Sequence, residues 1–207
     1  MKNETLKNNV VVVEGEIISG PSFSHEVYGE GFYLVEILSK RLSGNFDCIP
    51  VMISERLIDV AQDYQGKFIR VTGQFRSYNR HEEKKNRLVL SVFAREVSFT
   101  DEENDKARTN QISLDGYICK NPVYRKSPLG REISDILLEV NRRYNKADYV
   151  PCICWGRNAV FASGLKVGDH IQTEGRIQSR EYRKKISEWE YEFRTAYEVS
   201  VSKIELV

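Results

Sequence analysis

The chain lacks long hydrophobic runs: none of its apolar stretches approaches the roughly 18 residues that a membrane-spanning helix needs. The start of the sequence holds only the valine run of residues 10–13, and it has no cleavage pattern of small residues. We therefore expect neither a membrane protein nor a secreted one, and we expect this protein in the cytoplasm.

Cysteine and histidine are also scarce, with four and three residues. In a cytoplasmic chain, cysteines are more often reduced and buried than paired, and here they are Cys48, Cys119, Cys152 and Cys154. A metal site would need further ligands at suitable spacing, which neither Cys152 and Cys154 nor the histidines have. A phosphate-cradling glycine loop and a nucleophile motif are missing as well. The sequence thus predicts no metal, no cofactor and no enzymatic activity.

Charge of one sign is not in strong excess, because 31 Lys+Arg and 30 Asp+Glu give a net charge of +1. A duplex-binding protein usually carries a clear positive surplus. The composition, 41% hydrophobic and 29% charged, is typical of a globular protein. If nucleic acid is the partner, it must be held by more than bulk charge.

What the sequence does contain is an internal repeat. Three landmarks recur 101 positions later, and they are Gly15, Pro21 and Pro50, matched by Gly116, Pro122 and Pro151. Farther on, "FIRVTGQFRS" around Gly73 matches "HIQTEGRIQS" around Gly175. Glycine and proline hold backbone geometry that other residues adopt poorly, so a shared spacing indicates one structural plan used twice. We expect two domains, residues 1–100 and 110–207, joined by a polar linker over residues 101–109.

The hydrophobic pattern predicts the same elements in both units. In the first unit the predicted strands are 10–18, 31–38, 48–53, 68–78 and 87–99, with a turn at "SGPS" and a helix over 54–66. In the second they are 111–119, 132–144, 149–155, 170–182 and 191–206, with a short helix within 156–164. One helix between the third and fourth strands is the order of the OB-fold, a five-stranded Greek-key barrel. The predicted fold class is all-β with short helices: two tandem OB-folds.

The strand over 149–155 alternates between two kinds of side chain. Val150, Cys152 and Cys154 share one face, which suits a packed interior. Tyr149 and Trp155 share the other face with Ile153. Large amphipathic rings on an outward face suit the stacking of bases, although a subunit contact would use them as well.

The second unit resembles the bacterial single-stranded DNA-binding protein family over nearly all of residues 110–207. The resemblance is carried by "NQISLDGYICKNP", "LLEVNRRYNKADYVPCICWGRNA", "LKVGDHIQTEGRIQSREY" and "YEFRTAYEVSVSKIEL". The first unit resembles the family more weakly, through "VVVEGEIISGP" and "GKFIRVTGQFRS". Some family members have two such barrels in one chain.

The resemblance implies a set of nucleic-acid-binding residues. Tyr144, Tyr149, Trp155 and Tyr182 fall where the family carries base-stacking aromatics. Arg157, Lys166 and Arg180 fall where it carries phosphate-contacting cations. Arg176, Lys184 and Lys185 complete the predicted set. The run "REYRKK" over 180–185 heads a predicted hairpin, and it suits either a phosphate-binding arm or a solvated tip.

The first unit departs from the family at positions where the second unit carries its predicted stacking aromatics. Cys48 stands where the second unit has Tyr149, and Ser54 stands where it has Trp155. Phe75 matches Ile177, a position typical of a core. We interpret the first unit as a barrel whose binding face is weakened or put to another use.

The leading hypothesis is a non-enzymatic protein that binds single-stranded DNA with little sequence preference, in replication, recombination or repair. A primosome-type accessory protein with weak DNA affinity is the alternative. We expect a homodimer presenting four barrels, because single-barrel relatives typically form tetramers. The sequence ends inside its last predicted strand, so we expect no acidic tail for recruiting replication enzymes.

Overall fold

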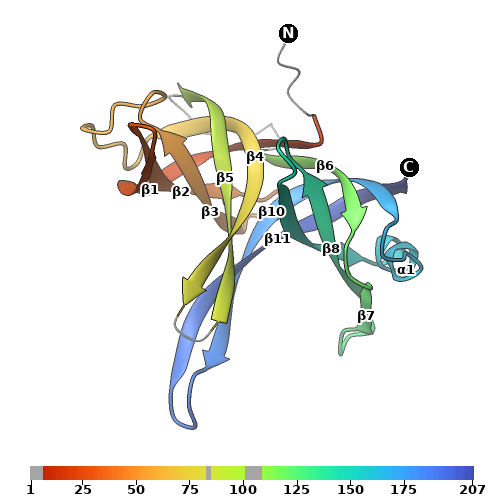
Figure 1. Cartoon of the computed structure of the whole chain (residues 1–207). Helices are drawn as coiled ribbons and strands as arrows, with labels where there is room; N and C mark the ends of the chain where they lie inside the picture. Colours follow the sequence, from red (N-terminus) through yellow and green to blue (C-terminus); the bar gives the residue numbers. More distant parts are fainter. Residues whose placement is uncertain (1–6, 83–84, 101–108) are drawn as a thin grey trace.

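The computed structural model describes residues 7–82, 85–100 and 109–207, without the side chains of residues 80–86. The first barrel consists of β1 (Asn9–Val27), β2 (Glu30–Lys40), β3 (Phe46–Ser54), β4 (Phe68–Glu82) and β5 (Lys85–Thr100). The second consists of β6 (Asn110–Ile118), β7 (Val123–Lys126), β8 (Glu132–Asn141), β9 (Ala147–Trp155), α1 (Arg157–Ser163), β10 (His170–Lys185) and β11 (Tyr191–Leu206). Figure 1 shows the two barrels side by side.

Each unit closes into a five-stranded barrel. The first runs β2-β3-β5-β4-β1 and closes by pairing of β1 with β2. The second runs β6-β10-β11-β9-β8 and closes by pairing of β6 with β8. In both, the third strand pairs in parallel with the last, and the other ladders of the barrel are antiparallel. The predicted fold class, two tandem OB-folds, is confirmed.

The repeated glycines mark places where strands approach closely. A Cβ at Gly15 would lie 2.3 Å from the carbonyl oxygen of Leu38, and one at Gly116 would lie 2.4 Å from that of Glu139. A Cβ at Gly73 or at Gly175 would lie just as close to a backbone carbonyl oxygen. Only glycine fits without a backbone shift, which explains why the spacing of these residues survives in both units.

Two predicted local features are wrong. The segment over 54–66 forms turns instead of a helix. Asp59 and Asp63 each accept a hydrogen bond from a backbone N–H two residues on, an arrangement that competes with helical bonding. The "SGPS" stretch is an irregularity within β1, which shifts register between Ser19 and Ser22 and continues to a turn after Val27. The predicted elements also lack β7, a short exposed edge strand.

The two barrels share one sheet because β1 pairs with β6 in antiparallel register. An asparagine side chain beside this seam repeats in each unit. Asn9 exchanges two hydrogen bonds of 2.8 Å with the backbone of Phe75, and Asn110 does the same with Ile177 at 2.6 and 2.9 Å. Phe75 and Ile177 are fully buried, as predicted for core positions.

A second pair of contacts crosses from barrel to barrel. The buried Asp47 of β3 accepts a hydrogen bond of 2.8 Å from the backbone N–H of Ser179, and Asp148 of β9 accepts one of 2.8 Å from that of Ser77. The seam therefore has approximate two-fold symmetry within one chain.

The linker predicted over 101–109 lies outside the described residues except for Thr109. The carbonyl oxygen of Thr109 accepts from the backbone N–H of Glu14, and its hydroxyl donates to the carbonyl oxygen of Lys40. The second unit is thus anchored to the first at this residue.

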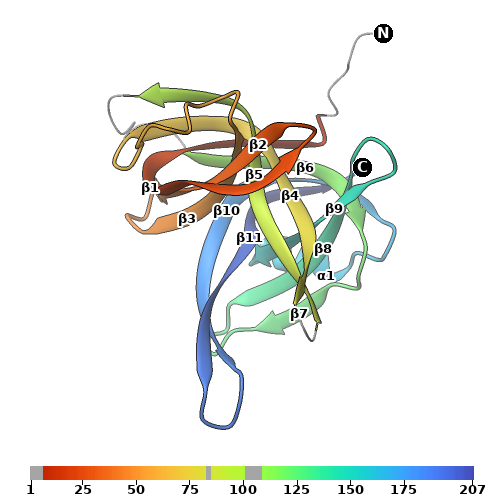
Figure 2. The same ribbon diagram turned by 60° about the vertical axis from the view of Figure 1, so that its left-hand side comes forward.

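Two long hairpins, β4–β5 and β10–β11, extend beyond the barrels. Figures 1 and 2 show both of them projecting from the same side of the molecule. Their strands pair antiparallel from Phe68 to Thr100 and from Ile171 to Leu206.

Candidate nucleic-acid interface

The outer face of the second barrel carries a shallow groove of about 380 Å³, called here the outer groove. Strands β7 to β11 supply its lining: Arg125, Asp135, Ile136, Pro151, Cys152, Ile153, Trp155, Gln178, Arg180 and Glu198. It brings together two of the predicted site residues, Trp155 and Arg180. An aromatic ring and a cation in one groove can take a base and the phosphate beside it.

Trp155 ends β9 and is partly exposed. The guanidinium carbon of Arg131 lies 5.7 Å from the centre of its ring, a cation–π distance. Cys152 and Cys154 lie on the opposite face of the strand and are buried in the core, as predicted. The alternation of the strand therefore holds the indole outward.

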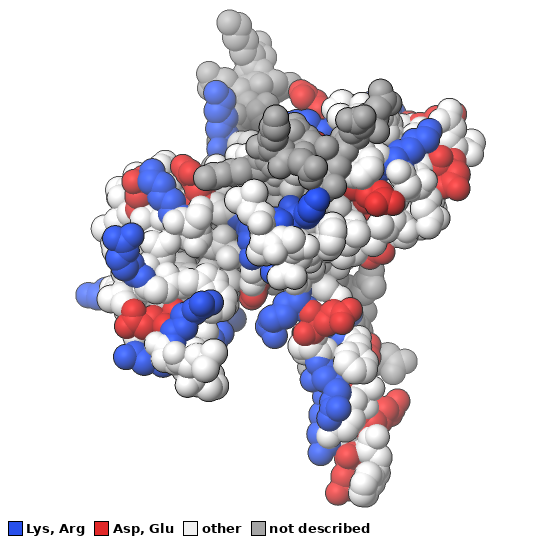
Figure 3. All heavy atoms as spheres, turned by 180° about the vertical axis from the view of Figure 1, so that it is seen from behind, with Lys and Arg blue, Asp and Glu red and all other residues white. Residues whose placement is uncertain are grey.

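One face of β10 extends the outer groove toward the projecting hairpin. Gln178, Arg180, Tyr182 and Lys184 alternate along the strand and so share this face. The Arg180 guanidinium carbon lies 6.0 Å from the Tyr182 ring centre, and Arg180 Nε lies 3.9 Å from a carboxylate oxygen of Glu198. Figure 3 shows Lys and Arg gathered along this hairpin, with acidic residues toward its tip.

The opposite face of the hairpin carries a group that the sequence reasoning missed. The guanidinium carbon of Arg183 lies 3.8 Å from the ring centre of Tyr191, and Phe193 is 75% exposed. Alternation of rings along β11 was the available signal. Lys185 lies on this face, so the predicted hairpin residues divide between two sides.

Other predicted residues lie away from the outer groove. Tyr149 is the third residue of β9, six residues before Trp155, which places it roughly 20 Å away along the strand. Tyr144 is 90% exposed in the turn between β8 and β9 and faces the junction of the barrels. Arg157 is the first residue of α1, and Lys166 follows that helix.

Arg176 is occupied by a contact between the barrels. One of its Nη atoms lies 2.8 Å from Asp47 Oδ2, and the other donates to Gln178 Oε1 at 3.0 Å. Burial lowers the pKa of Arg176, while Asp47 acts in the opposite direction. This geometry assigns Arg176 a structural contact, and its predicted role toward DNA stays a prediction.

The first barrel has a different outer face. Ser54, in place of Trp155, is buried and donates its hydroxyl to Glu30. Aromatic residues occur instead on β2 and β5, where the rings of Phe32 and Phe93 lie 5.6 Å apart. The guanidinium carbon of Arg76 lies 4.1 Å from the Phe93 ring centre. Comparison at matching positions could not reveal this cluster, because its rings occupy other positions.

The cysteine side chains are suited to packing. Burial raises the pKa of Cys154 to about 12 and that of Cys48 to about 11, and it raises the pKa of Cys152 well above its usual value. Burial therefore disfavours the reactive thiolate form of these side chains. Within the described ranges no three His, Cys, Asp or Glu side chains form a metal-binding group, and no helix there could cross a membrane.

Residues 109–207 match the model of the Single-strand binding protein family. The resemblance predicted from the sequence is confirmed. The Single-stranded DNA-binding protein 2 of Listeria innocua is 34% identical over 80 residues, 35% of this chain and 50% of that protein. The Single-stranded DNA-binding protein A of Bacillus subtilis is 34% identical over 80 residues, 35% of this chain and 46% of that protein. The chain thus spans about half the length of the curated relatives it matches.

The solved structures support the tandem fold. The wild-type single-stranded DNA binding protein from Thermus aquaticus superimposes with a TM-score of 0.72 at 21% identity, covering 96% of this chain and 92% of that one. A deletion mutant of the same protein gives the same TM-score at 20% identity, covering 96% of this chain and 94% of that one. At these identities the likeness establishes the fold.

Proposed function

We propose that this chain is a non-enzymatic protein that binds single-stranded DNA with little sequence preference, during replication, recombination or repair in the cytoplasm. The observation that carries the proposal is the outer groove, where Trp155 and Arg180 lie together and lead onto the cationic hairpin. The relatives named as single-stranded DNA-binding proteins support it.

The chemistry of the groove explains why the proposed binding would depend little on the base sequence of the DNA. A ring stacks on the π-face of any base, at about 1 to 3 kcal/mol per base. Arg180 and Lys184 reach phosphates, which are the same at every nucleotide. Because the net charge is only +1, the stacked rings must supply much of the affinity.

The test is a titration of fluorescently labelled oligo-dT, followed by anisotropy at several salt concentrations. We expect saturable binding that weakens as salt rises, and much weaker binding of a duplex of equal length. Equal affinity for duplex and single strand would contradict the proposal. Absence of binding at low salt would favour the primosome-type accessory role.

We also propose that the domains comprise residues 1–100 and 110–207 and that two chains form a homodimer with four barrels. The β1–β6 seam already pairs two barrels within one chain, so a dimer would present the four barrels of a tetramer. A two-fold interface must be self-complementary. Light scattering should give the mass of two chains, and a monomer mass across the micromolar range would contradict this.

A further inference from the structure

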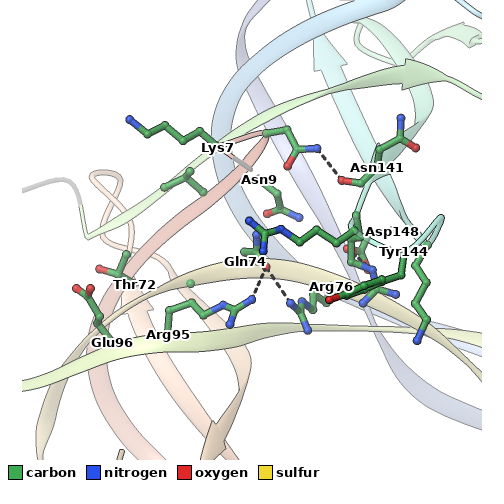
Figure 4. Close-up of a pocket in the computed structure, with 16 residues that line it drawn as sticks. Lys7, Asn9, Thr72, Gln74, Arg76, Arg95, Glu96, Asn141, Tyr144 and Asp148 are labelled. Atoms are coloured by element: carbon green, nitrogen blue, oxygen red, sulfur yellow. Dashed lines mark hydrogen bonds and ion pairs between the residues drawn. The ribbon is translucent and has the colours of Figure 1, made fainter. Parts of the chain in front are cut away.

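A second and larger hollow, called here the junction pocket, lies where the two barrels meet (Figure 4). Its volume is about 630 Å³. The first barrel contributes the start of β1 and parts of β4 and β5, and the second contributes the end of β8, the turn after it and Asp148 of β9. Six cations line it against only two carboxylates, and they are Lys7, Arg76, Arg95, Arg142, Arg143 and Lys146 against Glu96 and Asp148.

Two of these guanidinium groups donate to the amide oxygen of an uncharged side chain. Arg76 and Arg95 both donate to Gln74 Oε1, at 3.0 and 3.4 Å, as Figure 4 shows. In the part of the chain that the structure describes, neither forms an ion pair with a carboxylate. Nε of Arg76 is buried there without a hydrogen-bond partner.

The charged groups around the junction pocket also leave positive charge in excess. Burial, together with the positive charges of Arg95 and Arg142, lowers the pKa of Arg76 to about 10, against the effect of Asp148. Asp148 lies 3.4 Å from Arg142 Nε and also accepts from the backbone N–H of Ser77. This one buried carboxylate leaves the pocket with an excess of positive charge, so a bound anion would relieve the repulsion.

The symmetry of the seam supplies an internal comparison. The related pocket on the other side has about 270 Å³ and contains Arg41 and Arg176. There Asp47 accepts hydrogen bonds from both guanidinium groups. Both arginines of that pocket are therefore paired with one of the chain's own carboxylates.

The difference between the two pockets comes from an exchange of two residue types. On β10 the order is Arg176 followed by Gln178, whereas the matching positions of β4 hold Gln74 followed by Arg76. Arg176 reaches Asp47, but Arg76 lies two residues farther along its strand and stacks on Phe93 beside Arg95. The exchange withdraws an arginine from the carboxylate and leaves it facing the junction pocket.

We propose that the junction pocket binds a phosphate group of the single strand and so guides the strand from one barrel to the other. This inference rests on the proposed function. Guanidinium groups bind phosphate oxygens in paired hydrogen bonds, and a cluster from both barrels fits a group that bridges them. Rings flank the pocket, with Tyr144 exposed on the second barrel and Phe93 under Arg76 on the first. Such rings favour a polynucleotide over a small free anion.

The test removes one exposed cation from each barrel, Arg95→Gln with Lys146→Gln. Each phosphate contact in a single strand contributes about 0.7 to the slope of log affinity against log salt. Because the pocket holds one phosphate, we expect the slope for oligo-dT to fall by about 0.7 relative to the wild-type chain. The matched control, Arg56→Gln with Lys203→Gln, also removes two exposed cations, each paired with a glutamate outside the pocket. It should leave the slope nearly unchanged.

The outcomes separate the two proposals. A wild-type chain that binds no oligo-dT would overturn the proposed function itself. Binding by the wild-type chain with equal slopes for the pocket and control variants would overturn the junction pocket alone, provided that thermal melting shows both variants folded. Phosphorus NMR of inorganic phosphate without DNA distinguishes the source of the anion. Phosphate binding lost in the pocket variant, with an unchanged oligo-dT slope, would assign the pocket to a free anion and contradict the strand path.

Discussion

Replacing Tyr149 and Trp155 together by alanine is expected to lower the affinity for oligo-dT by about 30-fold or more. Each stacked base is worth about 1 to 3 kcal/mol, so two lost rings remove at least about 2 kcal/mol. The rings lie roughly 20 Å apart on β9, far enough for their effects to add. Anisotropy of labelled oligo-dT measures the loss at fixed salt.

The matched control is Phe161→Ala with Phe99→Ala, which removes two exposed rings from other faces. Phe161 lies on α1, and Phe99 stacks on Tyr64 in the first barrel. The control should bind oligo-dT within about threefold of the wild-type chain. If both double variants lost affinity equally, general destabilisation would be the cause, and the stacking account of β9 would be wrong.

Replacing Phe32 and Tyr33 by alanine is expected to act through stability. Phe32 is only 9% exposed and packs against Phe93 and His25, so it has little free face for a base. Tyr33 makes an edge contact with Phe23. Loss of a buried phenylalanine costs about 3 to 5 kcal/mol, and we expect the lower end because this ring lies outside the main core cluster. Urea unfolding measures the change.

The same variant should bind oligo-dT nearly as well as the wild-type chain under conditions where it is folded. That result would distinguish the roles of the two barrels. A loss of affinity comparable with that of the Tyr149 and Trp155 variant, without a loss of stability, would show that the first barrel stacks bases through Phe32 and Tyr33.

The fold was largely predictable because its constraints are local and repeated. Gly15 and Gly116 sit where a Cβ would collide with a neighbouring strand, so no other residue serves at either place. Alternation predicted the buried face of β9 correctly, including Cys152 and Cys154.

The errors arose where side chains competed with a regular pattern. Helical spacing of apolar residues over 54–66 was real, and Ile58 and Tyr64 are indeed buried. Hydrogen bonds of Asp59 and Asp63 to nearby backbone N–H groups nevertheless favour turns. A stretch of apolar residues can fill the end of a barrel without forming a helix.

The candidate site was predictable only in part. The sequence placed Trp155 and Arg180 in one set, and the structure brings them into one groove. It could not show that Arg176 contacts Asp47, because that contact depends on how the barrels dock. The junction pocket was invisible for the same reason, since Arg95 and Lys146 come from different barrels.

The most direct test of stacking uses a chain with a single tryptophan. The sequence has two, and Trp189 is 89% exposed beyond the hairpin strands, so Trp189→Phe leaves Trp155 as the only indole. Titration of this variant with oligo-dT at low salt should quench its emission in a saturable way and recover as salt rises. Unchanged Trp155 emission while labelled oligo-dT binds would contradict the central claim that the strand stacks in the outer groove.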